Sequence, residues 1–401
     1  MKKVSIFVIL LIWDVGRSSQ NDEQKQSNII ETNSGKVQGK IVINNCNYHY
    51  EFLGIPYAEP PVEKLRLKPP VPVLPWSDVF QAFEDGPMCP QKSSPHLPNA
   101  TISEDCLSLN IFTNEIDEDD LKPVMVWIHG GGFSLGSKDI YRMQAVIDEE
   151  VVLVTINYRL HALGFLSFGN HLVSGNMGLK DQHLAIDWVR QNIQYFGGDP
   201  DRITLFGQSA GGISVQAHVL SPYSQGWQFS AIAQSGSILY LSVETPGEEE
   251  KFARNAAEAL GCPLTLDQDT LDCLQNVDVT ALVDNITDPD DAMFVNSFHD
   301  VKFSYWPVID DYADEPFLPM DPLQSLLQGS FNKVPYITGT VKNEGAYVNR
   351  AFGVAGVTGA DAVEYIKYPA TIGFMLYYGQ DQIFNQVAHT RTDRTHCFVL
   401  L

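Results

Sequence analysis

The sequence is poor in basic residues, lacks closely paired cysteines, and has no long apolar run beyond its first residues. Its 401 residues include 26 lysines and arginines against 49 aspartates and glutamates, a formal net charge of −23. Such a charge favours solubility and repels nucleic acid and anionic membranes, so we expect neither as a partner. No later stretch is long enough for an integral membrane span. No cysteine pair has the C-x-x-C spacing of a zinc site.

The first 19 residues have the form of a secretory signal peptide. Two lysines precede an apolar run at residues 4–13, and small residues follow at 16, 18 and 19. A run this short favours a cleaved signal over a membrane anchor, with a buried strand as the alternative. We therefore expect a secreted protein, with disulfides among its six cysteines and glycans at Asn99 and Asn285, which begin two sequons.

Short β-branched apolar runs alternate with helical patterns along the chain. The runs occupy residues 124–128, 151–156, 203–206, 231–233 and 334–337. The clearest helical pattern spans residues 181–195. This alternation predicts an α/β fold with a mainly parallel sheet covered on both sides, whereas residues 36–54 read as antiparallel strands with a turn near Asn44. No repeat, low-complexity segment or linker interrupts residues 20–401, so we predict a single domain there.

A G-x-S-x-G pentapeptide at residues 207–211, with Ser209 at its centre, carries the clearest chemical signal. It follows the apolar run 203–206, as in a nucleophile elbow, where a sharp strand-to-helix turn presents the serine. A serine hydroxyl is a weak nucleophile until a neighbouring base activates it. The motif therefore predicts ester hydrolysis through Ser209.

Two more groups follow apolar runs, where parallel sheets gather functional groups. Residues 129–132 read His-Gly-Gly-Gly, the form of an oxyanion-binding loop. We expect the N–H groups of Gly131, Gly132 and Ala210 to stabilise the oxyanion of acyl transfer. Glu344 comes after the serine and fits the acid that orients a catalytic histidine. A flexible glycine turn and a solvated loop glutamate are the alternatives.

Six further segments carry distinctive motifs. They are residues 52–61 (FLGIPYAEPP), 104–111 (EDCLSLNI), 127–133 (WIHGGGF), 157–159 (NYR), 175–182 (GNMGLKDQ) and 196–200 (FGGDP). With the elbow, they resemble the type-B carboxylesterases of the cholinesterase-like α/β-hydrolase family over about residues 37–349. The resemblance implies the α/β-hydrolase fold, a mainly parallel central sheet flanked by helices.

The resemblance also assigns roles to single residues. It implies that Ser209 is the nucleophile and Glu344 the acid of a catalytic triad that needs no metal and no other cofactor. It further implies two disulfides and two structural ion pairs. The disulfides are Cys89–Cys106 and Cys262–Cys273, and the ion pairs are Arg66–Glu104 and Arg159–Asp181. Cys46 and Cys397 would then pair with each other or stay free thiols.

The sequence departs from the family at the third member of the triad. In the family this is a histidine in a segment resembling G-x-x-H-G, well downstream of the acid, and no such segment follows Glu344 here. Only His389 and His396 come after the acid, and both lie closer to it than the family's histidine does. We therefore expect the catalytic histidine and the C-terminal portion of the fold to be absent. We expect His129, beside the oxyanion glycines, to have a structural role.

Two departures from cholinesterases narrow the substrate. Residues 90–103 of the first disulfide loop contain no aromatic side chain that could hold a choline cation, and Gln208 stands where cholinesterases carry Glu. We therefore expect hydrolysis of small neutral carboxylic esters through a serine acyl-enzyme, impaired by the missing histidine. The alternative is a non-catalytic secreted binding or adhesion protein, as in neuroligin-like relatives; the intact elbow speaks against it.

Overall fold

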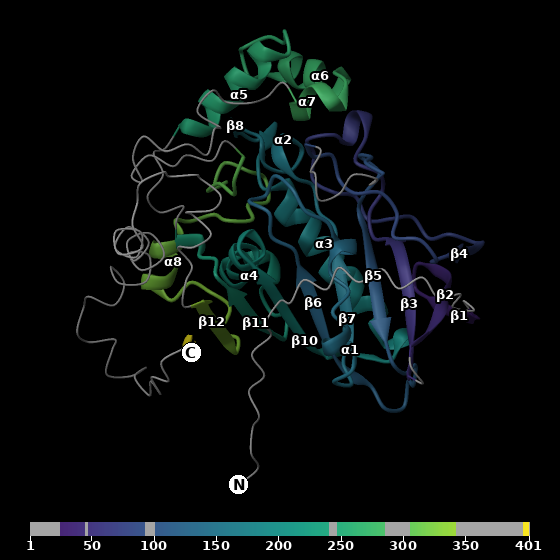
Figure 1. The fold of residues 1–401 in the computed structure, drawn as a ribbon. Helices are drawn as coiled ribbons and strands as arrows, with labels where there is room; N and C mark the ends of the chain where they lie inside the picture. The colour runs from purple at the N-terminus through teal and green to yellow at the C-terminus, as the bar shows by residue number, and fades with distance from the viewer. Residues whose placement is uncertain are drawn as a thin grey trace, which may run out of the picture.

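The computed structural model describes residues 25–44, 47–92, 101–239, 247–284, 305–341 and 396–400 (Figure 1). The strands are β1 (Lys25–Thr32), β2 (Gly35–Asn44), β3 (Asn47–Pro56), β4 (Val79–Gln81), β5 (Ser108–Thr113), β6 (Lys122–Ile128), β7 (Val152–Ile156), β8 (Ser167–Asn170), β9 (Val173–Ser174), β10 (Gly198–Gln208), β11 (Phe229–Gln234), β12 (Tyr336–Val341) and β13 (His396–Leu400). The α-helices are α1 (Gln144–Ile147), α2 (His161–Phe165), α3 (Met177–Asn192), α4 (Ala210–Leu220), α5 (Glu248–Ala259), α6 (Gln268–Asn276), α7 (Val279–Asp284) and α8 (Pro322–Gln328). Four 3₁₀ turns, η1 to η4, cover Glu63–Leu65, Lys138–Ile140, Ile193–Phe196 and Pro222–Ser224.

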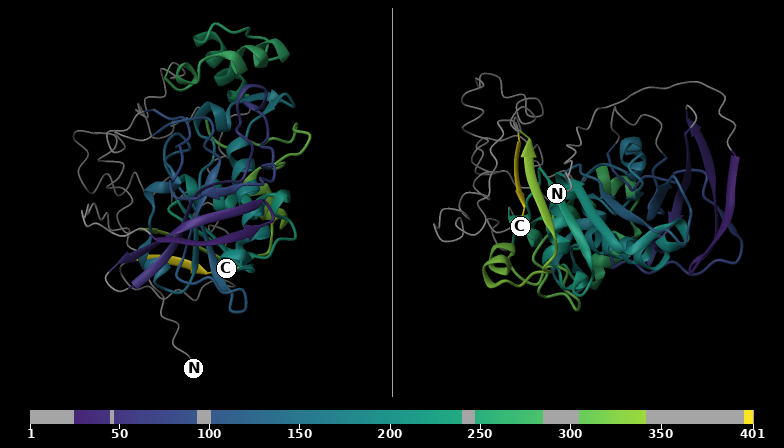
Figure 2. Two further views of the ribbon diagram at one scale, coloured as in Figure 1. Left: turned by 90° about the vertical axis from the view of Figure 1, so that its right-hand side faces the viewer. Right: turned by 90° about the horizontal axis from the view of Figure 1, so that it is seen from below.

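Eleven strands form one mixed sheet. Its order is β1-β2-β3-β5-β7-β6-β10-β11-β12-β13, with β4 paired to β2, and β8 and β9 form a separate two-stranded sheet. The central strands β7, β6, β10, β11 and β12 are parallel. Strands β1, β2, β3 and β5, and β13 beside β12, are antiparallel to their neighbours along this order, whereas β4 pairs parallel with β2. Figure 2 shows β12 and β13 side by side at the opposite end of the sheet from β1 and β2. The predicted α/β class and the antiparallel pair within residues 36–54 are confirmed.

The central strands separate two apolar cores because alternate side chains point to opposite faces. In β6, Val124, Val126 and Ile128 belong to the larger core, which contains the buried sides of α3 and α4. Trp127 lies in a second cluster with residues of α1 and with Phe206 of β10, whose ring centroid is 4.9 Å away. The sheet is therefore covered by α3 and α4 on one face and in part by α1 on the other.

A buried ion pair anchors α3, the helix predicted over residues 181–195. Asp181, in its second turn, accepts hydrogen bonds from Nε and Nη2 of Arg159 at 2.8 and 2.6 Å and from its backbone N–H at 2.9 Å. Both side chains are almost fully buried. The pair fixes α3, which begins four residues before the predicted pattern, to the segment that follows β7.

Two disulfides and a second ion pair hold the loops around η1 and α6. The disulfides are Cys89–Cys106 and Cys262–Cys273, the pairs that the resemblance implies. Loops of this length contribute about 3 kcal/mol each in the chain-entropy model. Arg66 pairs with both carboxylate oxygens of Glu104 at 2.7 and 2.6 Å and donates to the carbonyls of Leu274 and Val277. The segment after η1 is thereby joined to the end of α6.

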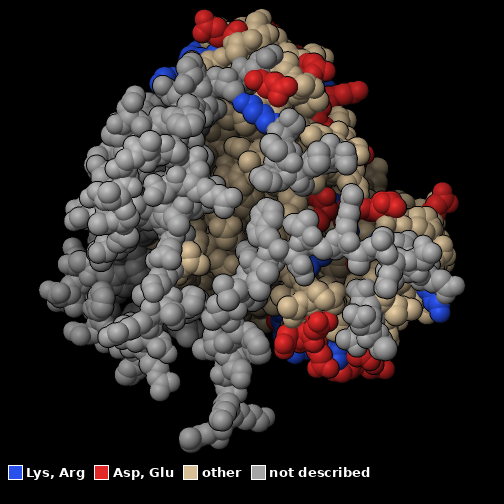
Figure 3. All heavy atoms as spheres, in the orientation of Figure 1, with Lys and Arg blue, Asp and Glu red and all other residues tan. Residues whose placement is uncertain are grey.

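Acidic side chains lie at the upper end of the face seen in Figure 3, over α5 to α7, and in a second group at its lower edge. Within the described segments, no helix combines the length and apolarity that a bilayer crossing requires. The signal peptide predicted at residues 1–19, the asparagines of both sequons (Asn99 and Asn285) and Cys46 lie outside the described residues. The single domain over residues 20–401 stays a prediction.

Candidate active site

Ser209 lies on the sharp turn between β10 and α4. Its φ of 57° and ψ of −122° form a backbone conformation that is costly for any residue with a side chain. Its N–H donates to the carbonyl of Gln234 in β11 at 2.9 Å, which ties the turn to the neighbouring strand. The residue is half-buried, so the turn holds its side chain within reach of solvent.

The glycines of the pentapeptide let α4 approach the end of β6 closely. Cβ atoms built on Gly207 and Gly211 would lie 2.7 and 2.0 Å from the carbonyl oxygen of Ile128, closer than real atoms approach. A Cβ built on Gly130 would lie 3.3 Å from the Cβ of Ser209. The elbow and the glycine run are therefore in contact, although Gly130 and Ser209 are 79 positions apart in sequence.

Hydrogen bonds to two carbonyls fix the direction of the N–H groups in the glycine run. The Nδ1 of His129 donates to the carbonyl of Gly130 at 2.9 Å. Because a trans peptide is planar, holding this carbonyl points the N–H of Gly131 the opposite way. The carbonyl of Gly131 accepts from the N–H groups of Ser134 and Leu135, both at 3.1 Å. Holding this carbonyl fixes the direction of the Gly132 N–H for the same reason.

A third N–H is fixed in the same way at the elbow. The carbonyl of Ser209 accepts from the N–H of Ile213 at 2.9 Å, which orients the N–H of Ala210. The N–H groups of Gly131, Gly132 and Ala210 donate to no carbonyl or side chain of the described residues. A Cβ built on Gly132 would likewise meet none of their atoms within 4 Å. Oriented donors beside open space can stabilise a negatively charged oxygen.

His129 is built into the scaffold of this loop. It is 1% exposed, its ring stacks on that of Tyr158 at 4.4 Å, and the Tyr158 hydroxyl donates to its carbonyl at 2.8 Å. Burial lowers the pKa of His129 to about 4, so the ring is neutral near pH 7. Since Nδ1 donates to Gly130, His129 acts here as a structural donor. Tyr158 was missed by the sequence reasoning, although the Asn-Tyr-Arg motif could have drawn attention to it.

The structure does not test the acid predicted from the sequence, or one of the two histidines that follow it. Glu344 and His389 lie outside the described residues. β12, which ends at Val341, reaches the same sheet edge as the elbow, because the N–H of Ser235, directly after β11, donates to the carbonyl of Gly339 at 2.8 Å. In β13 the backbone of His396 pairs with Val341. The structure thus joins Ser209 to the glycine run and leaves the placing of acid and base as a prediction.

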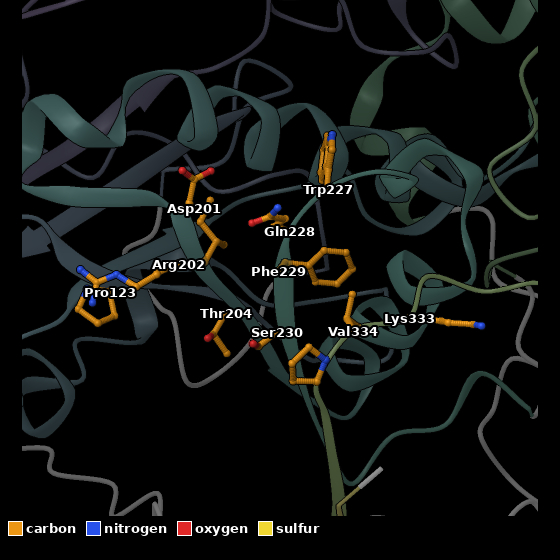
Figure 4. Close-up of a pocket in the computed structure, with 12 residues that line it drawn as sticks. Pro123, Asp201, Arg202, Thr204, Trp227, Gln228, Phe229, Ser230, Lys333 and Val334 are labelled. Atoms are coloured by element: carbon orange, nitrogen blue, oxygen red, sulfur yellow. The ribbon is translucent and has the colours of Figure 1, made fainter.

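A cavity of the described residues lies at the other edge of the sheet. It has a volume of about 410 Å³ and is lined at the amino ends of β10 and β11 and just before β12 (Figure 4). Thr204 and Ser230 are neighbours there, with Arg202 and Lys333 at its sides. Thr204 is separated from Ser209 by about 16 Å of strand. This cavity cannot contribute to chemistry at the elbow.

The described residues also contain no cluster of three or more His, Cys, Asp or Glu side chains that could hold a metal.

Comparisons with known proteins agree with this arrangement. The model of the carboxylesterase family matches residues 26–370. A carboxylic ester hydrolase of Bombus ignitus is 39% identical over 87% of this chain and 62% of its own length. A juvenile hormone esterase of Tribolium castaneum is 38% identical (79% and 55%), and liver carboxylesterase B-1 of Rattus norvegicus is 38% identical (79% and 59%). The chain thus spans between 55% and 62% of the length of these relatives.

Proposed function

Because the chain belongs to the carboxylesterase family, with the α/β-hydrolase fold, we propose that it hydrolyses carboxylic esters through an acyl-enzyme on Ser209. One observation carries the proposal: a strained turn presents this serine beside a glycine loop whose N–H groups are held in fixed directions. A binding protein has no need of either feature.

In the proposed reaction, Ser209 Oγ attacks the ester carbonyl carbon while its proton passes to a base. The carbonyl oxygen gains the electron pair, and the N–H groups of Gly131, Gly132 and Ala210 stabilise it. Collapse of this intermediate breaks the bond to the alcohol, which leaves with the proton held by the base. Water then attacks the acyl group in the same way, releasing the carboxylic acid and free serine. Loss of one such N–H donor costs about 3–4 kcal/mol.

We assign the triad acid to Glu344 and leave the base unassigned. The described histidines around the two cores are held by packing: burial lowers the pKa of His129, His161 and His183 to about 4 and that of His218 to about 3. A serine without its base reacts on the order of 10⁶-fold more slowly. A phosphonate labels each serine once and for good, so long incubation with it can detect a slow serine that turnover would miss.

The side chain beside the nucleophile favours neutral esters as substrates. A Cβ built on Gly130 would lie 3.2 Å from Gln208 Oε1, so this amide is part of the wall beside Ser209. An uncharged amide there gives no attraction to a cationic substrate.

We also assign the protein to the secretory pathway, with residues 1–19 as its signal and glycans at Asn99 and Asn285. Two disulfides fit an oxidising compartment.

Labelling with a fluorophosphonate and release of 4-nitrophenol from 4-nitrophenyl acetate test the proposal. We expect Ser209→Ala to abolish labelling and to lower turnover at least a hundredfold where turnover is measurable. The matched control is Ser230→Ala, a half-buried serine in the cavity at the opposite sheet edge, which should label like the unmodified chain.

A folded sample that neither labels nor hydrolyses would overturn the esterase and favour the secreted binding or adhesion protein.

A further inference from the structure

Gln91 is a buried side chain that pairs with the far end of the glycine loop. Its Oε1 accepts from the N–H of Gly136 at 2.9 Å, and its Nε2 donates to the carbonyl of Gly136 at 2.8 Å and to that of Cys89 at 3.1 Å. The residue is 6% exposed. Both polar groups of one backbone residue are therefore held by a single amide, 45 residues away in sequence.

Gly136 rests directly on the hydrogen bond that orients the glycine run. A Cβ built on it would lie 2.5 Å from His129 Nδ1 and 2.6 Å from the carbonyl oxygen of Gly130. Those are the two atoms whose bond directs the N–H of Gly131. A small displacement of Gly136 must therefore shift the ring of His129 or the carbonyl of Gly130, and the direction of the N–H follows the carbonyl.

We propose that Gln91 is a positioning residue for the oxyanion-binding loop, acting through Gly136 on the His129–Gly130 hydrogen bond. This inference rests on the proposed esterase function. The side chain touches no reacting atom; it holds the loop in the geometry that stabilises charge in the transition state. The disulfide Cys89–Cys106 fixes the backbone from which Gln91 reaches, so the support is covalent on one side and hydrogen-bonded on the other.

The loop has a second, independent anchor, which explains why Gln91 matters for direction rather than for folding of the loop. The Oδ1 of Asn157 accepts from the N–H of Lys138 at 2.9 Å and from the hydroxyl of Ser137 at 3.2 Å. This anchor holds the loop just after Gly136. Loss of Gln91 therefore leaves the loop attached but frees Gly136 to move against His129.

Gln91→Leu keeps the volume and removes all three hydrogen bonds, and Gln275→Leu is its matched control. Gln275 is equally buried at 6% exposure and donates to two backbone carbonyls, those of Lys64 and Arg66, with no contact to the glycine loop. We expect Gln91→Leu to lower kcat for 4-nitrophenyl acetate, or the maximal rate of fluorophosphonate labelling, at least tenfold, with KM changed less than twofold. We expect Gln275→Leu to keep kcat within twofold. Its melting temperature should fall by about as much as that of Gln91→Leu.

Gln91→Glu covers the case in which the leucine variant does not fold. It has the same shape and still accepts from the N–H of Gly136, but it cannot donate to the Gly136 carbonyl when ionised. Its kcat should lie between those of the unmodified chain and of Gln91→Leu. Equal kcat in the unmodified chain and both Gln91 variants would overturn the inference.

Hydrogen exchange separates failure of this inference from failure of the proposed function. Deuterium uptake in peptides covering residues 130–137 should rise at least fivefold in Gln91→Leu and stay unchanged in Gln275→Leu. This readout needs no turnover. If the unmodified chain is inert but exchange rises, the esterase proposal fails and the positioning role stands. If exchange is unchanged, the positioning role fails whatever the activity.

Discussion

At the scale of single residues, the strongest constraint is the backbone of Ser209. A non-glycine residue in this region of φ and ψ carries strain of about 1–3 kcal/mol. The hydrogen bond from Ser209 to Gln234 and the packing of Gly207 and Gly211 hold the turn in place. Strain held by its surroundings in this way is typical of a residue kept for chemistry at the expense of stability.

Ser209→Gly should therefore unfold at a higher denaturant concentration than Ser209→Ala. Glycine removes the strain but adds about 0.5–1 kcal/mol of backbone entropy to the unfolded chain. The net gain in the free energy of unfolding should be about 1 kcal/mol. Urea unfolding followed by tryptophan fluorescence measures it. The two variants should be equally inactive, so an equal or lower midpoint for the glycine variant would show that the turn is unstrained.

Local sequence predicted some of these residues and not others. The positions of Ser209 and of the glycine run follow from spacing within five residues, because the elbow and the loop are local structures. Gln91 and Tyr158 act through contacts 45 and 29 residues away in sequence, and no local pattern reports such a contact. Glu344 was chosen for its place after a strand and stays a prediction.

At the scale of elements, hydrophobic periodicity predicted the centre of the sheet well. β6, β10 and β11 each contain the run predicted for them, and β7 begins one residue later than its run, because strands buried on both faces must be apolar throughout. β12 begins at Tyr336, two residues later than predicted. The start of α3 at Met177, four residues before the predicted start, was also missed; Lys180 in this first turn is buried and donates to the carbonyl of Glu315, a partner that the helical pattern does not reveal.

The ion pair between α3 and Arg159 gives a prediction at this scale. Asp181→Asn leaves the buried Arg159 guanidinium without its counter-charge, and we expect a loss of about 3–5 kcal/mol in the free energy of unfolding. The control on the same helix is Asp187→Asn, whose pair with Arg190 is 3.8 Å long and partly exposed. That change should cost less than about 0.5 kcal/mol. Urea titrations measure the free energy of unfolding of both variants. Comparable losses in Asp181→Asn and Asp187→Asn would show that the buried ion pair does not stabilise the fold more than the exposed one.

At the scale of the whole molecule, histidines buried without charge make folding sensitive to acid. Burial lowers the pKa of His129, His161 and His183 to about 4, and that of His218 to about 3, against an ordinary value of about 6.5. As pH falls below about 6.5, these histidines become protonated in the unfolded chain but stay neutral in the folded chain. Stability is therefore fully present above pH 6.5 and is lost down to about pH 4, by up to about 1.4 kcal/mol per histidine and pH unit.

His218→Gln tests this dependence. His218 is fully buried, with Nδ1 3.3 Å from the Ser224 hydroxyl, and glutamine keeps a polar group there without titrating. The slope of unfolding free energy against pH, from urea titrations at pH 6.5, 5.5 and 4.5, should fall by up to about 1.4 kcal/mol per unit. An unaltered slope in His218→Gln would mean that this ring is protonated within the fold.

The disulfide next to Gln91 makes the order of the glycine loop depend on the redox conditions in which the chain folds. Cys89 and Cys106 can join only under oxidising conditions, and their bond fixes the strand of chain from which the Gln91 amide reaches Gly136. A copy that folds among reduced thiols should hold its glycine loop less firmly and attack esters more slowly.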